Sequence, residues 1–253
     1  MPKVSIIILT KDRAGFLKQA LESVRLQTFF DYEVIVVNDG SRDSTPQILK
    51  DSRLKDLKIL NHQNSVGIIK SRQEALQQAA GEYVAFLDDD DEWVDKDKLK
   101  KQVEFLEKHQ DYVLVGGGIV IRMQNEELRM KNGGQEKFRP TVDAAIRKTM
   151  LLRNNFFTST VMFRKSKALE AGGFISDGVD VAEDYDLWLR MGRLGKMYNF
   201  KQVFTSYRQS SYNKAKFRKF LLKQLALIKR HKTAYEGYYL SSIILNLRLF
   251  LNF

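Results

Sequence analysis

Residues 83–93 are YVAFLDDDDEW, an apolar run that leads directly into four consecutive aspartates. The run predicts a buried strand over Tyr83–Leu87, because short apolar stretches bounded by polar residues are typical of parallel sheets. Adjacent carboxylates repel one another unless a cation or hydrogen-bond donors lie nearby. An acidic run taken alone is more often a solvated turn. Here it follows a buried strand, and open α/β sheets bind ligands at the carboxyl ends of their strands, so we expect a metal and phosphate site.

Short apolar runs alternate with longer amphipathic segments over the first third of the chain. Strands are predicted over 4–10, 33–37 and 57–60, and helices over 15–27, 44–50 and 68–80. This alternation predicts βαβ units around a parallel sheet, and hence an α/β fold.

The pattern becomes more mixed after Trp93. Helices are predicted over 95–110, 142–152, 166–171 and 184–194, and strands over 112–123 and 158–163. Three consecutive glycines, 116–118, suggest a bulge or the close approach of another backbone. Residues 125–140 are polar and contain glycine, so we expect a loop there.

The composition excludes several classes of protein. Hydrophobic residues make up 43% of the 253 residues, enough for a sizeable core, and no cysteine is present. Disulfides, thiolate metal sites and cysteine nucleophiles are therefore excluded, and a reducing compartment fits. No apolar stretch reaches the ~20 residues that cross a bilayer.

The positive charge is concentrated at the C-terminal end. Net charge is +11 overall, but residues 207–253 hold ten Lys or Arg and one Glu, whereas the first 206 residues have a net charge of only +2. A nearly neutral body with a basic tail argues against a uniformly basic nucleic-acid-binding module.

Polar side chains follow other predicted strands at the same sheet edge. Thr10 ends the first strand, and Asp39 follows the second. Asp39 could accept hydrogen bonds from a nucleotide base, or it could be an ordinary turn aspartate beside a glycine. Arg72 could direct its guanidinium at a base or diphosphate, although a single helix arginine is usually a surface charge.

Two further acids, Glu183 and Asp184, stand at the start of a predicted helix. Acids at this end interact favourably with the helix dipole, so a structural cap is one interpretation. The other is that one of them is a general base facing the cleft.

Taken in order, these motifs resemble glycosyltransferase family two, the inverting nucleotide-sugar transferases with the GT-A fold. The resemblance covers roughly residues 3–208 and rests on segments 4–13, 34–45, 64–72, 86–93 and 183–190. It implies a Rossmann-like nucleotide-binding half, 1–93, fused to an acceptor half, 94–206, around a mostly parallel mixed sheet. A basic amphipathic helical tail, 207–253, follows.

The resemblance also implies residue roles. Residues that bind the nucleotide-sugar donor would be Thr10, Asp12, Asp39, Arg72, Asp88 and Asp89. Among them, Asp39 would read a uracil-like edge and Asp88 would approach the ribose. Asp90 would hold a divalent Mn²⁺ or Mg²⁺ ion. Asp184 would be the catalytic base, with Glu183 as its catalytic neighbour.

Two departures from the family pattern stand out. Gln209 follows Tyr207-Arg208 where many members have histidine, which leaves a metal or diphosphate role there unsupported. The Gln-x-x-Arg-Trp mark of processive synthases is absent from the sequence, so transfer of a single sugar is favoured.

The tail allows two interpretations. Residues 214–232 form a basic amphipathic helix and 240–253 an apolar end, a combination suited to lying in a membrane surface. The alternative is a helix packed on the catalytic body or a second subunit.

The expected function is transfer of one sugar to a saccharide or lipid-linked saccharide during surface polysaccharide or glycan biosynthesis, with a UDP-sugar as the expected donor. A polyprenyl-phosphate sugar synthase is the rival enzyme. A basic nucleic-acid-binding or nucleotide-sugar-sensing module is the alternative from another class. We expect a cytoplasmic protein, peripheral at the cytoplasmic face of the membrane if the tail binds there, that binds no nucleic acid.

Overall fold

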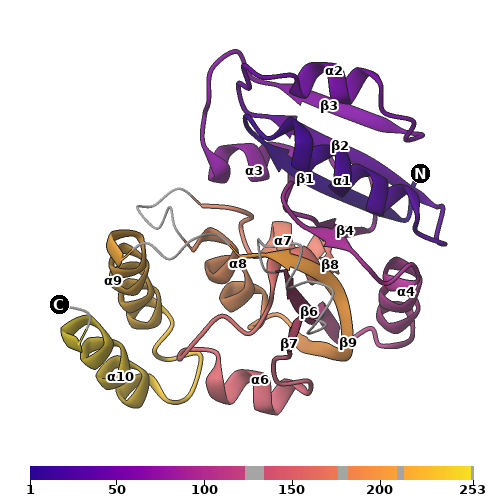
Figure 1. The fold of residues 1–253 in the computed structure, drawn as a ribbon. Helices are drawn as coiled ribbons and strands as arrows, with labels where there is room; N and C mark the ends of the chain where they lie inside the picture. The colour runs from indigo at the N-terminus through magenta and orange to yellow at the C-terminus, as the bar shows by residue number, and fades with distance from the viewer. Residues whose placement is uncertain (123–133, 176–181, 210–213, 252–253) are drawn as a thin grey trace.

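The computed structural model describes residues 1–122, 134–175, 182–209 and 214–251. Within these residues the strands form one sheet in the order β3-β2-β1-β4-β8-β6-β9-β5, with β7 paired to β6 (Figure 1). The strands are β1 (Val4–Thr10), β2 (Tyr32–Asn38), β3 (Leu57–Asn61), β4 (Tyr83–Phe86), β5 (Glu92–Trp93), β6 (Tyr112–Arg122), β7 (Gln135–Lys137), β8 (Met162–Arg164) and β9 (Lys196–Arg208). β1 to β4 are parallel, β8 adds antiparallel pairs, and β6 and β9 are parallel again, so the α/β prediction is confirmed.

Helices cover both faces of the sheet. They are α1 (Ala14–Arg25), α2 (Thr45–Lys50), α3 (Ile68–Gln78), α4 (Lys98–Lys108), α6 (Asp143–Thr149), α7 (Lys165–Glu170), α8 (Glu183–Met191), α9 (Lys214–Arg230) and α10 (Tyr238–Leu251). Alternate residues of β1 point to opposite faces: Ile6 and Ile8 pack in one core with α1 and α4, and Ile7 packs in the other with α3 and α8. The sheet therefore lies between two apolar layers.

The register of the parallel strands brings their polar ends together. Thr10 pairs with Asn38 across β1 and β2, and Ile7 pairs with Phe86, the last residue of β4. The side chains that follow these strands, Asp39 and Asp88, consequently leave the sheet at one edge.

The longest strand was not predicted. β9 has thirteen residues and pairs with β6 along its length, with register shifts at the triple glycine. Strands are recognised by alternation of apolar and polar residues. In β9 this alternation is interrupted by the register shifts and by charged or amide residues in the middle of the strand. The expected close approach at the glycines is confirmed, because a Cβ on Gly117 would collide with the ring of Phe204.

Two other predictions need correction. The strand expected over 158–163 is instead a 3₁₀ turn, η1 (Thr158–Thr160), followed by β8. Hydroxyl side chains bond to nearby groups and favour turns over strands. In the loop expected over 125–140, residues 135–137 form β7, and 125–133 lie outside the described residues.

The first tail helix packs against the body. Leu221, Leu227 and Ile228 of α9 are fully or almost fully buried in the core shared with α8. The packed interpretation is therefore correct for α9. In the described part of the chain, no helix combines the length and apolar character that crossing a bilayer requires.

Candidate active site

A cleft of about 720 Å³ opens at the carboxyl edge of the sheet, between β1, β2, β4 and the start of α8. Eight of the nine predicted site residues line it: Thr10, Asp39, Arg72, Asp88, Asp89, Asp90, Glu183 and Asp184. Asp12 is not among the lining residues. It is exposed at a turn with a positive φ of 54°, and its carboxylate accepts a hydrogen bond from the backbone of Arg42.

The acidic run is paired inside the protein. One guanidinium nitrogen of Arg13 lies 2.9 Å from carboxylate oxygens of both Asp89 and Asp90. Asp91 is only 2% exposed, and it accepts hydrogen bonds from Ser159 Oγ (2.6 Å) and the backbone of Arg208 (2.9 Å). Burial, with the nearby charge of the acidic run, raises the pKa of Asp91 to about 8. The solvated-turn interpretation is therefore wrong for this run.

Arg72 is a buried link between three elements. It is 4% exposed, and its guanidinium donates to Glu183 Oε1 (2.6 Å) and Asp88 Oδ1 (3.2 Å). Its Cζ lies 5.1 Å from the ring centre of Phe86 and 5.9 Å from that of Phe174. The arginine of α3 thus joins the end of β4 to the first residue of α8, and the surface-charge interpretation fails.

Glu183 and Asp184 are adjacent but differ in environment. Burial raises the pKa of Glu183 to about 7, even though Arg72 opposes the shift. Asp184 is partly exposed to the cleft, and its Oδ2 accepts hydrogen bonds from Thr158 Oγ1 (2.5 Å) and Asn154 Nδ2 (3.4 Å). These two donors orient the carboxylate of Asp184 and leave it beside the space where a substrate would lie.

Asp39 is saturated with hydrogen bonds from its own surroundings. Ser65 Oγ (2.6 Å), Val66 N (2.8 Å), Gly67 N (3.1 Å) and His62 Nδ1 (2.8 Å) all donate to it. Burial alone would raise the pKa of Asp39, but these bonds together lower it to about 2. Asp39 therefore ties the end of β2 to the loop that precedes α3. Its carboxylate can accept a hydrogen bond from a nucleotide base only if its oxygens also keep these donors or if one of these donors is replaced by the base.

The fold and the cleft are shared with known proteins. The model of the family described as glycosyl transferase family 2 matches residues 5–170. The chain belongs to glycosyltransferase family 2. The resemblance of its motifs to that family is thereby confirmed.

Curated relatives of this family 2 chain come from several bacteria. A putative glycosyltransferase, EpsE, of Bacillus subtilis is 30% identical over 83% of this chain and 74% of its own length. An uncharacterized glycosyltransferase of Haemophilus influenzae is 29% identical over 82% of this chain, which spans 65% of that relative. A GalNAc(5)-diNAcBac-PP-undecaprenol beta-1,3-glucosyltransferase of Campylobacter jejuni is 29% identical over 83% of this chain and 67% of its own length.

Solved structures share the family fold. The mannosyltransferase PcManGT of Pyrobaculum calidifontis, in complex with GDP-Man and Mn²⁺, superposes with a TM-score of 0.68 at 18% identity, covering 99% of this chain and 70% of that one. S. aureus TarS 1–349 in complex with UDP-GlcNAc gives 0.65 at 23% identity, covering 89% and 66%. At these identities the likeness shows the fold alone, and it confirms the GT-A prediction.

Besides Arg72, three basic side chains in the cleft of this family 2 chain were not predicted as site residues. Lys11, Arg13 and Arg208 all line it. Arg208 ends β9, and its guanidinium lies 4.3 Å from the ring centre of Phe16 and bonds to the backbone oxygen of Asp90. Because β9 was missed, the only pointer to Arg208 was the Tyr207-Arg208 pair of the family pattern, and Gln209 after it left that position without an expected role. For Lys11 and Arg13, the available signal was their position directly after β1.

The acidic residues suit a divalent cation only in part. Asp88 and Asp90 supply carboxylate oxygens, which hard cations such as Mg²⁺ and Mn²⁺ prefer. Among the described residues, no three His, Asp or Glu side chains come together as a metal cage. Mg²⁺ commonly uses one or two protein carboxylates and takes its other ligands from phosphates and water. The chain's carboxylates fit that incomplete kind of site.

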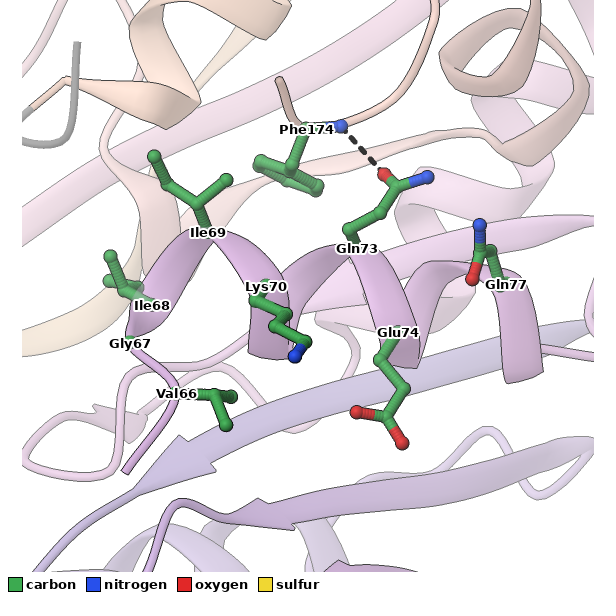
Figure 2. Close-up of a pocket in the computed structure, with 9 residues that line it drawn as sticks. All are labelled: Val66, Gly67, Ile68, Ile69, Lys70, Gln73, Glu74, Gln77 and Phe174. Atoms are coloured by element: carbon green, nitrogen blue, oxygen red, sulfur yellow. Dashed lines mark hydrogen bonds between the residues drawn. The ribbon is translucent and has the colours of Figure 1, made fainter. Parts of the chain in front are cut away.

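A second cavity of about 830 Å³ lies along α3 (Figure 2). Ile68 lines both this cavity and the catalytic cleft. Phe174 stands at its wall, where its backbone N–H donates to Gln73 Oε1 (2.7 Å). The hydrogen bond holds the segment before α8 against α3, next to the ion pair of Arg72 and Glu183.

Removing that ion pair is expected to destabilise the protein. Arg72→Met leaves Glu183 buried without its cation, so the free energy of unfolding should fall by about 3–5 kcal/mol. Urea unfolding measures the change. Arg25→Met is the matched control: it breaks an exposed pair with Glu22 and should cost under about 1 kcal/mol. Equal losses in the two variants would contradict a linking role for Arg72.

Proposed function

We propose that this chain is an inverting glycosyltransferase that moves a single sugar from a nucleotide-sugar donor to an acceptor hydroxyl. The observation that carries the proposal is one cleft whose lining includes Asp184, the carboxylates Asp88 and Asp90, and the cation of Arg13. A carboxylate base opposite a site for a charged leaving group is what a single in-line displacement requires.

In the proposed reaction, the carboxylate of Asp184 accepts the proton of the acceptor hydroxyl. The hydroxyl oxygen then bonds to the anomeric carbon as the bond from that carbon to the diphosphate breaks, which inverts the configuration. The transition state has oxocarbenium character. Thr158 and Asn154 orient the base, and Glu183 holds the start of α8 through Arg72.

The leaving group carries the developing negative charge. A bound Mn²⁺ or Mg²⁺ ion would neutralise charge on the departing diphosphate, and Asp90, with Asp88, is the residue that would hold it. Arg13 and Arg208 lie in the same cleft and add fixed positive charge to it. Arg13 pairs with both Asp89 and Asp90, so its positive charge lies directly beside the carboxylate that would hold the ion.

For the donor we propose a UDP-sugar. Similar folds were solved with UDP-GlcNAc in TarS and with GDP-Man and Mn²⁺ in PcManGT, so the fold accepts more than one nucleotide. Asp39 would share its carboxylate with the N–H of a uracil-like base by exchanging one of its loop donors.

For the acceptor we propose a saccharide or lipid-linked saccharide in surface polysaccharide biosynthesis. One relative is named as acting on an undecaprenol-linked saccharide, and another, from Erwinia amylovora, as an amylovoran biosynthesis glycosyltransferase. A polyprenyl-phosphate sugar synthase would use the same nucleotide half, and analysis of the product separates the two. The cytoplasmic location expected from the sequence stays a prediction.

Titration calorimetry with UDP, GDP, dTDP and CMP, each with and without Mn²⁺, tests the proposal. One nucleotide, expected to be UDP, should bind at least about tenfold more tightly with the metal, since the cation joins Asp90 to the diphosphate. Asp111→Ala, which removes an exposed carboxylate that does not line the cleft, serves as the control and should bind like wild type. Binding of none of the four nucleotides would contradict a donor site here and would favour a nucleic-acid-binding function, which predicts affinity that falls steeply with salt.

A further inference from the structure

The second tail helix, α10, has an apolar face that the described protein leaves uncovered. Its buried side is short, with Ser241 and Leu245 nearly or fully buried against the body. The large apolar side chains on the opposite side are 53–81% exposed: Tyr239, Leu240, Ile243, Leu247, Phe250 and Leu251. Their spacing of three, four and seven residues places them on one stripe of the helix.

The sequence also predicted an apolar face suited to a membrane surface on α9, the first tail helix. The structure shows a different arrangement there. Most apolar side chains of α9 pack in the hydrophobic core around α8. In contrast, α10 lies beside α9 at the edge of the molecule (Figure 1). The side chains of its apolar stripe are exposed. Contiguous exposed apolar side chains of this size mark an interaction surface.

Charge decides which partner suits the face. Residues 207–253 carry ten basic side chains and one acid, a net charge of +9. Packed helices lie about 8–10 Å apart, which is close to the Debye length of about 8 Å at physiological salt. The basic residues of α9 and of the turn after it, Lys229 and Lys232 among them, therefore act on whatever approaches α10.

A second copy of the chain does not suit this surface. A symmetric dimer through α10 would bring two such +9 segments together, and like charges across an interface oppose association. A partner with an apolar interior and a negative surface satisfies both features of the face. An anionic lipid bilayer has that chemistry, because its headgroups attract lysine and arginine while its acyl boundary takes up apolar side chains.

We infer that α10 docks this chain on the surface of an anionic membrane, lying in the interface with its apolar stripe in the headgroup and acyl boundary. As described, α10 has fourteen residues, Tyr238–Leu251, fewer than the ~20 that a membrane-spanning helix needs, so we place it in the interface.

The docking helix is connected to the cleft through α9, which it contacts. Arg230 and His231, at the end of α9, bond to the Asp186 carboxylate on α8 at 3.2 and 3.3 Å. Asp184, the proposed base, stands two residues earlier on the same helix. Docking through α10 would consequently hold the cleft at a set height and orientation above the bilayer, where the head of a lipid-linked acceptor lies.

Vesicle co-sedimentation with the full chain tests the inference. Wild type should bind vesicles of phosphatidylcholine and phosphatidylglycerol and should show little binding to phosphatidylcholine alone. The triple variant Ile243→Gln, Leu247→Gln, Phe250→Gln should bind the anionic vesicles at least about tenfold more weakly. Glutamine is a good helix former, so α10 should persist, and circular dichroism checks it.

A matched control removes equally exposed apolar side chains from the body. Phe30, Val94 and Val142 are 48–81% exposed and lie outside the tail. Their triple glutamine variant should bind the anionic vesicles like wild type. A second variant, Lys229→Gln with Lys232→Gln, should bind more weakly, by about fivefold for each lysine near the surface, and its binding should be less sensitive to salt.

Three results would overturn the inference: wild type that does not bind anionic vesicles, an α10 variant that binds like wild type, or a control that loses as much binding. A chain that is dimeric in solution and becomes monomeric in the α10 variant would assign the face to a second copy instead. The assay contains no donor, so it stands apart from the proposed transfer. Nucleotide binding without vesicles should be the same in wild type and in all three variants.

Discussion

Replacement of Asp184 by asparagine should reduce the rate of sugar transfer by about 10²–10⁴-fold, the usual contribution of a general base. Asparagine keeps the size of the side chain and can still accept the hydrogen bond from Thr158, so the start of α8 should keep its geometry. It cannot take a proton from the acceptor. Steady-state kinetics should therefore show a fall in kcat, and calorimetry should show donor binding within about twofold of wild type.

Glu183→Gln separates the two adjacent acids. Glu183 is buried and its carboxylate is occupied by the guanidinium of Arg72, so we assign it as a positioning residue and not the base. Its glutamine variant should retain most of the activity, although the free energy of unfolding should fall because the buried arginine loses its anion. Normal transfer by Asp184→Asn, or a larger activity loss in Glu183→Gln, would contradict the assignment of the base.

Replacement of Asp90 by alanine should abolish the gain in donor affinity that Mn²⁺ provides. We expect at least about a tenfold loss of affinity in the presence of metal, equal to the gain that Mn²⁺ gives the wild type, since even changes around metal ligands cost 10–100-fold. The alanine variant should bind the nucleotide about as weakly with Mn²⁺ as without it. Calorimetry with UDP, with Mn²⁺ or with EDTA, gives both numbers.

Arg13 makes this experiment informative in either direction. It already pairs with Asp89 and Asp90 and could itself neutralise a diphosphate. If transfer by the wild type continues unchanged in EDTA, and Arg13→Gln rather than Asp90→Ala removes donor binding, the charge on the leaving group is stabilised by arginine. That result would contradict the metal role of Asp90 and leave the base assignment untouched.

Local sequence patterns were sufficient to predict the parallel strands of the first third of the chain. The strands β1 to β4 are short apolar runs that end in polar residues, and parallel pairing alone brings those ends to one edge. Asp39 and Asp88 to Asp90 therefore lie where the pattern predicted. Each of these signals is local, within about ten residues of the strand that carries it.

Local patterns failed where a residue's role depends on distant partners. β9 is interrupted by a bulged pairing with the triple glycine of β6, so its sequence lacks regular alternation. Arg208 reaches the cleft only because that strand ends there. The orientation of Asp184 by Thr158 likewise joins two turns that are 26 residues apart.

The sequence by itself determined the α/β class, the family and the edge of the sheet at which the chemistry lies, because hydrophobic period and motif order are properties of neighbouring residues. Only the tertiary structure decided what each charge does. It showed Arg72 as a buried link, Asp39 as the anchor of a loop, and α10 rather than α9 as the helix with an open apolar face. Burial and pairing depend on which elements pack together, and an identical side chain can be a surface charge, an ion-pair partner or a ligand according to that packing.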